Sequence, residues 1–84
     1  MENRFFNSNF ITSSYSINEL LKFNKGKKVC VILVFPSGEK EFSGILECTG
    51  VDHITLSEPS TGKWNVLPIC FIGCILFDEN INYS

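Results

Sequence analysis

Short apolar runs alternate with turns containing Pro or Gly between residues 26 and 79, and this is the hydrophobic pattern of a small all-β domain. The first run is apolar at almost every position, so both of its faces should be covered. The later runs mostly alternate between apolar and polar residues, as strands with one buried face do. A 3₁₀ turn is expected within residues 69–73. The five predicted strands are residues 28–35, 40–48, 53–57, 63–67 and 74–78.

The alternation also predicts which side chains face the core. Gly44 lies in the middle of the second strand, where a strongly curved sheet needs a bend. Pro68 follows the fourth strand and cannot donate a ladder hydrogen bond, so this strand ends there or lies at an edge. The predicted inward residues of the second and third strands are Phe42, Gly44, Leu46, Cys48, Ile54 and Leu56, with Thr55 and Ser57 outward.

A short helix is predicted before the strands. Ser16 and Glu19 have the spacing of a capping box, in which each side chain bonds to the backbone N–H of the other residue. Gly26 is well placed for the left-handed residue that ends such a helix. The apolar residues that share one helical face are Ile17, Leu20 and Leu21.

Five strands at this spacing, one bent by a central glycine, predict a small SH3-like or Sm-like barrel. The leading helix favours the Sm-like form. A single domain is therefore expected over residues 15–81, after a flexible tail at residues 1–14 that is rich in Asn and Ser. The aromatic residues of this tail, which are candidates for contact with the domain or a partner, are Phe5, Phe6 and Phe10.

Composition limits the functions that this domain can have. The chain has 84 residues and a net charge of −2, so it has no overall basic field that would attract nucleic acid. No apolar run approaches the ~20 residues of a membrane span, and no secretory signal is expected at the N-terminus. The cysteines lie in or beside apolar runs and are predicted to be small buried side chains: Cys30, Cys48, Cys70 and Cys74.

Catalytic chemistry is not expected, and no metal or cofactor is indicated. A thiol nucleophile needs a base and an orienting group, for which Cys48, His53 and Asp52 are the candidates. Adjacent strand residues point to opposite faces, so Asp52 and His53 should not bond to each other, and an inward Cys48 would be inert. His53 is instead expected to bond to a backbone carbonyl. Trp64 is predicted to lie in the core, with an exposed interface anchor as the alternative.

Three stretches of the chain carry motifs that occur together in one known family. They are residues 20–29, with Asn-Lys-Gly-Lys-Lys; residues 42–47; and residues 50–64, with Asp-His-Ile, Ser-Glu-Pro and Thr-Gly-Lys. The chain resembles the GerQ family of bacterial spore coat proteins over about residues 15–81. The residues of the family motifs are Asn24, Gly26, Gly44, Gly50, Asp52, His53, Pro59, Gly62 and Trp64.

The resemblance implies a structural and interaction role without catalysis. A member of this family would be made in the mother-cell cytoplasm and deposited in the spore coat. There it would bind other coat proteins and retain a cortex-lytic cell-wall hydrolase for germination, and a transglutaminase would cross-link its lysines. Because the chain contains no Gln, it could enter that reaction only as an amine donor. The candidate amines are those of Lys22, Lys25, Lys27, Lys28, Lys40 and Lys63.

An Sm-like RNA-binding module in the cytoplasm is the alternative function. Asp52 resembles the acidic residue of the first Sm motif, but no Asn follows it, and residues 72–73 lack the Arg of the second motif. Lysines near the turns would then contact phosphates, and such binding should weaken steeply with salt. Self-association is left open, and the edge near Trp64 with the aromatic tail is the predicted contact surface.

Overall fold

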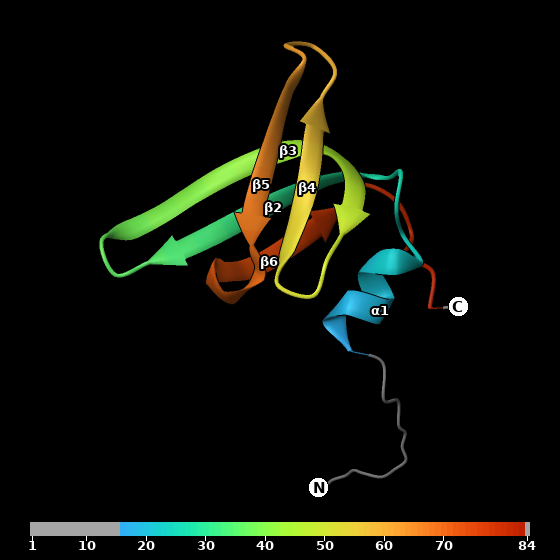
Figure 1. The fold of residues 1–84 in the computed structure, drawn as a ribbon, viewed down its shortest axis with the longest axis horizontal. Helices are drawn as coiled ribbons and strands as arrows, with labels where there is room; N and C mark the ends of the chain where they lie inside the picture. The colour runs from blue at the N-terminus through green and yellow to red at the C-terminus, as the bar shows by residue number, and fades with distance from the viewer. Residues whose placement is uncertain (1–15, 84) are drawn as a thin grey trace, which may run out of the picture.

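The computed structural model describes residues 16–83, and the predicted tail at residues 1–14 lies outside them. The helix α1 (Ile17–Lys22) comes before all the strands, as Figure 1 shows. The described chain is therefore all-β with a short leading helix, as predicted. The other elements are β2 (Lys28–Phe35), β3 (Gly38–Thr49), β4 (His53–Glu58), β5 (Lys63–Pro68), the 3₁₀ helix η1 (Ile69–Phe71) and β6 (Ile72–Phe77).

The five strands form one antiparallel sheet in the order β5-β4-β3-β2-β6. In Figure 1 the β4–β5 pair runs steeply across the β2–β3 pair, so the sheet is strongly curved. Within residues 16–83 the two edge strands, β5 and β6, do not pair with each other. The strand number and the leading helix agree with the prediction, and the sheet is open rather than closed into a barrel.

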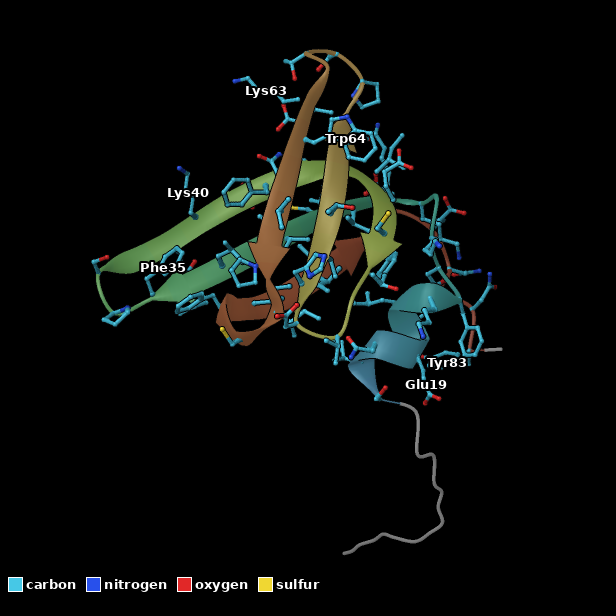
Figure 2. The ribbon with its side chains drawn as sticks, in the orientation of Figure 1. Glu19, Phe35, Lys40, Lys63, Trp64 and Tyr83 are labelled. Atoms are coloured by element: carbon cyan, nitrogen blue, oxygen red, sulfur yellow. The ribbon has the colours of Figure 1, made fainter. Side chains whose placement is uncertain are left out.

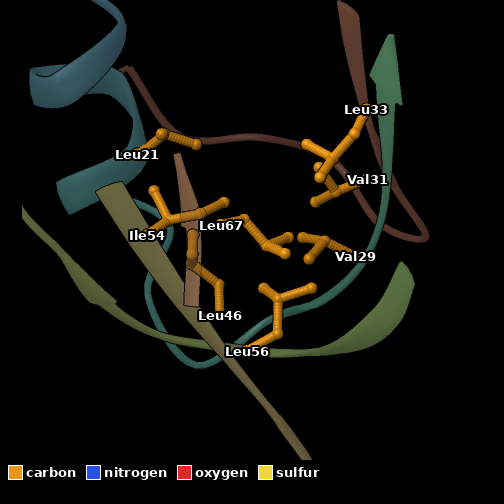
Figure 3. Close-up of a cluster of buried hydrophobic side chains, with 8 residues drawn as sticks. All are labelled: Leu21, Val29, Val31, Leu33, Leu46, Ile54, Leu56 and Leu67. Atoms are coloured by element: carbon orange, nitrogen blue, oxygen red, sulfur yellow. The ribbon is translucent and has the colours of Figure 1, made fainter. Parts of the chain in front are cut away.

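One cluster of aliphatic side chains forms the core. Figure 3 shows that β2, β3, β4, β5 and α1 all contribute to it. Leu21 projects from α1 at one end of this cluster, so the helix closes that end of the core. Full burial of an aliphatic side chain is worth about 1.5–3 kcal/mol, and the core is the main source of stability. The buried apolar residues are Leu21, Val29, Val31, Leu33, Leu46, Ile54, Leu56 and Leu67.

The start of α1 follows the prediction, but its end does not. The backbone N–H of Glu19 donates to the Ser16 hydroxyl over 3.2 Å, and the N–H of Ser16 donates to the Glu19 carboxylate over 3.3 Å. The helix stops at Lys22, so Gly26 is too far along the chain to be its terminal residue. Gly26 has a φ of +90° and donates its N–H to the Leu46 carbonyl over 2.7 Å. Its left-handed conformation therefore serves the turn into β2.

A β-bulge reverses the predicted orientation of Cys48. Leu46 lies opposite Leu56, but the next paired residue of β3 is Cys48, which lies opposite Thr55. Glu47 is the extra residue, and one inserted residue turns the following side chains to the other face. Cys48 is consequently exposed rather than inward.

The other cysteines also differ from the prediction of burial. Cys74 lies on the outer side of β6, opposite Ile32, while the neighbouring Ile75 packs against the core. The outer face of β2 is partly open as well, because Val34 is 46% exposed. Apolar neighbours in sequence did not indicate which face these residues occupy. Cys48, Cys70 and Cys74 are exposed, Cys30 is partly buried, and all of these thiols are free.

Candidate interaction surface

Asp52 and His53 bond to each other, contrary to the prediction. The His53 Nδ1 atom lies 2.8 Å from a carboxylate oxygen of Asp52. Asp52 belongs to the bend before β4, so the alternation of strand side chains does not separate this pair. The hydrogen bond from His53 is the main reason that the pKa of Asp52 lies below its ordinary value. Both side chains are solvent-exposed, and their contact orders the turn.

Close packing fixes the same turn at its two ends. The Gly50 N–H donates to the His53 carbonyl over 2.7 Å. A Cβ atom at Gly50 would lie 2.6 Å from the His53 ring, so a side chain fits only if the imidazole moves. The N–H of Ile69 donates to the Asp52 carbonyl over 2.9 Å, which joins η1 to the turn. The motif residues here thus order the connection between β3 and β4.

The loop between β4 and β5 is organised around Glu58. The Glu58 carbonyl accepts the N–H groups of Thr61 and Gly62 over 3.1 and 2.7 Å, and Gly62 has a φ of +74°. The Glu58 carboxylate accepts from Asn65 Nδ2 over 2.7 Å and from the Thr61 hydroxyl over 3.0 Å. These bonds, that of Asn65 first, lower the pKa of Glu58. Because Glu58 precedes the loop and Asn65 lies within β5, these bonds fix the start of β5. Pro59 is exposed within the loop.

Trp64 is exposed rather than in the core. It is 61% exposed, and Val66 is 63% exposed. Because alternate side chains of a strand share a face, the burial of Leu67 puts Trp64, Val66 and Pro68 together on the opposite side. Figure 2 shows Trp64 and Lys63 towards the tip of the β4–β5 hairpin. Trp64, Val66 and Pro68 are called the β5 outer face below.

The neighbouring strand, β4, carries polar side chains next to the β5 outer face. Thr55 lies opposite Val66, and its hydroxyl is buried without a hydrogen-bond partner among the described residues. Ser57 lies opposite Trp64 and is buried rather than exposed, with its hydroxyl donating to the Glu47 carboxylate over 2.6 Å. The β5 outer face is therefore an apolar strip on an edge strand, beside the polar side chains of Thr55 and Ser57 on β4.

Asn24 forms a buried polar hub that no periodic pattern in the sequence indicates. Its Nδ2 group donates to the carbonyls of Leu20 and Asn82 over 2.7 and 2.8 Å. Its Oδ1 atom accepts from Lys27 Nζ over 2.8 Å and from the Asn82 N–H over 2.7 Å. Lys27 Nζ also donates to the Asn80 carbonyl over 2.6 Å. Asn24 and Lys27 thus fasten the C-terminal residues, and only the position of this Asn within a family motif could have indicated it.

The candidate cross-linking lysines differ in accessibility. The Lys27 amine is held by the hub, and its side chain is partly buried. Three of the remaining candidates lie within residues 22–28, whereas Lys40 and Lys63 lie on β3 and β5. The exposed candidates are Lys22, Lys25, Lys28, Lys40 and Lys63.

The family-motif residues occupy several places rather than one site. One group lies at the start of β4 and another follows its end, and the length of this six-residue strand, roughly 16 Å, separates them. Gly44 has a separate role, because a Cβ atom there would collide with the Ser57 carbonyl oxygen. Phe5, Phe6 and Phe10 lie outside the described residues.

Among residues 16–83 no cluster of His, Cys, Asp or Glu could hold a metal ion, and none of the helices there has the length and apolarity for crossing a membrane.

The sequence comparisons place this chain among spore coat proteins. Residues 11–83 match the family described as Spore coat protein (Spore_GerQ), and the chain belongs to this family. It is 35% identical over 78 residues to the spore coat protein GerQ of Bacillus subtilis (strain 168). The matched region is 88% of this chain but 42% of the relative, so the chain spans less than half of the relative's length. The predicted membership of the GerQ family is confirmed.

Proposed function

We propose that this chain is a non-catalytic structural component of the spore coat that retains a cortex-lytic cell-wall hydrolase for germination. Its production in the mother-cell cytoplasm belongs to the same proposal. The observation that supports it most is the family match, which covers residues 11–83. A retained enzyme needs a binding surface, and the described residues offer a well-ordered one.

The β5 outer face is the proposed contact with the hydrolase. Trp64 and Val66 expose apolar area on a strand that is held by the Glu58 loop, so little order has to be gained on binding. Trp is also the residue type most enriched among interface hot spots. An exposed Trp flanked by a second apolar side chain therefore favours this face over the polar surface beside it.

Cross-linking by a transglutaminase is the proposed means of anchorage. In that reaction the lysine ε-amine attacks the side-chain amide of a glutamine, forms an isopeptide bond and releases ammonia. This chain contains no Gln, so other coat proteins would supply the acyl group. The five exposed lysines are suitable amines, whereas the Lys27 amine already donates two hydrogen bonds.

The location is tested first, with a fluorescent fusion in a sporulating host. A ring of fluorescence around the forespore is expected. A diffuse signal in vegetative cells, together with RNA binding that falls steeply with salt, would overturn the proposal and favour the Sm-like alternative.

Retention of the hydrolase is tested next, in spores that carry substituted copies of the chain. Trp64→Ala should reduce the hydrolase found by immunoblot in the coat fraction, while the fusion itself still forms a ring. Val51→Ala is the matched control, because Val51 is an apolar residue that is 85% exposed outside the β5 outer face. Normal hydrolase levels with Trp64→Ala would exclude this face as the contact.

A further inference from the structure

The two edges of the sheet differ in how well they are protected. An exposed edge strand offers unpaired backbone groups to another strand, and charged residues or Pro normally discourage such pairing. β5 begins with Lys63 and ends with Pro68. β6 has the sequence Ile-Gly-Cys-Ile-Leu-Phe, with no charge and no Pro, and no strand among residues 16–83 covers its free side. β6 is therefore the unprotected edge.

Both faces of β6 are apolar. On the core side, Ile75 and Phe77 pack against the buried cluster. On the outer side, Cys74 is exposed and Leu76 is 49% exposed. A strand that is apolar on both faces is typical of the interior of a sheet rather than its edge.

An apolar patch extends from the outer side of β6 onto β2. The pairing places Leu76 opposite Cys30 and Cys74 opposite Ile32, so these side chains share the outer face. On the next strand, β3, the residues opposite this part of β2 are polar or charged, including Glu41 opposite Ile32. The patch is thus limited on the β3 side and open at the β6 edge.

The inner side of the same edge carries an apolar groove. It has a volume of about 270 Å³ and lies between α1 and β6. Its walls include Ile17 and Leu20 from the helix, Ile75 and Phe77 from the strand, and Ile81. A strand added to β6 would therefore meet apolar surface on both of its own faces.

We propose that β6 pairs antiparallel with β6 of a second copy of this chain. The added strand must be apolar on both faces, and β6 itself meets that requirement. A two-fold axis between two copies makes the strands antiparallel and brings no like charges opposite each other within residues 72–77. Each copy would then place apolar side chains beside the groove and beside the outer patch of the other. The result is a continuous ten-stranded sheet, twice the five strands of one copy.

Light scattering after size-exclusion chromatography of the full chain, in reducing buffer, tests the proposal. The wild type should have the mass of a dimer. Leu76→Lys places two charges near the two-fold axis and should weaken the dimer by about tenfold or more in Kd. Val66→Lys is the matched control, since Val66 is an exposed aliphatic residue on the other edge strand, and its dimer should persist. A monomeric wild type, or a dimer lost only with Val66→Lys, would overturn the proposal.

Hydrogen exchange locates the contact without any substitution. Amide protection in residues 72–77 should rise with protein concentration, while protection in residues 63–68 should not. A concentration-dependent rise in residues 63–68 alone would assign the contact to β5. Strong protection of residues 72–77 in a protein that stays monomeric would show that another segment, such as residues 1–15, covers the edge. Either result refutes pairing of two β6 strands.

Discussion

Substitution of Asn24 by Ala should strongly destabilise the fold. The change removes four side-chain hydrogen bonds, two donated and two accepted. A hydrogen bond contributes about 0.5–1.5 kcal/mol net, and water can reach part of this cluster once the side chain is gone. We therefore expect the free energy of unfolding to fall by about 2–4 kcal/mol, in the lower half of the summed range. For a domain of this size that corresponds to a loss of roughly 10 °C or more in Tm.

Thermal and urea denaturation followed by circular dichroism measure this effect. Asn82→Ala is the matched control, because Asn82 contributes only backbone groups to the hub. It should change the free energy of unfolding by less than about 0.5 kcal/mol, as surface substitutions usually do. If Asn24→Ala were equally mild, the hub would not hold the C-terminal residues, and the account of the Asn24 motif would be wrong.

Gly44→Ala should lower stability by about 1–3 kcal/mol, because the new methyl group overlaps the Ser57 carbonyl; an unchanged urea midpoint would contradict this. With a limiting amine-acylating reagent, peptide mass spectrometry should find Lys27 modified most slowly among the lysines of residues 16–83, and rapid modification would show an open hub. The pKa of Glu58 is lowered in the folded state from 4.5, so its stabilising effect is present above that value and lost as pH falls through the folded pKa. Asn65→Ala should therefore flatten the decline of Tm as pH falls below 4.5, and an unaltered slope would argue against the Asn65 bond.

Hydrophobic pattern alone predicted the strands well. Residues 28–35 form β2 with the predicted limits, because a long apolar run bounded by a Lys pair and a Pro turn leaves few alternatives. The capping box at Ser16 was also predicted correctly, because both of its hydrogen bonds join residues three positions apart. β6 begins two residues before its predicted start, where the 3₁₀ helix proves shorter than residues 69–73. Local signals thus located the elements.

Features that depend on distant residues were not predictable in this way. The bulge at Glu47 depends on how β3 pairs with β4, and it alone explains the exposure of Cys48. The exposure of Trp64 depends on which face of β5 meets the core, and a six-residue strand with apolar residues on both faces fits either choice. The Asn24 hub joins residues 58 positions apart in sequence, so no local pattern indicates it.

The two proposed contacts lie on opposite edges of the sheet, and this makes their effects separable. β5 and β6 stand at the two ends of the strand order, with three strands between them. Trp64→Ala should therefore reduce hydrolase retention and leave the mass of the purified protein unchanged. Leu76→Lys should weaken the dimer, and it should also reduce retention only if the hydrolase needs two β5 outer faces at once. Loss of the dimer with Trp64→Ala would instead show that copies meet through β5, and the open β6 edge would then need a different partner.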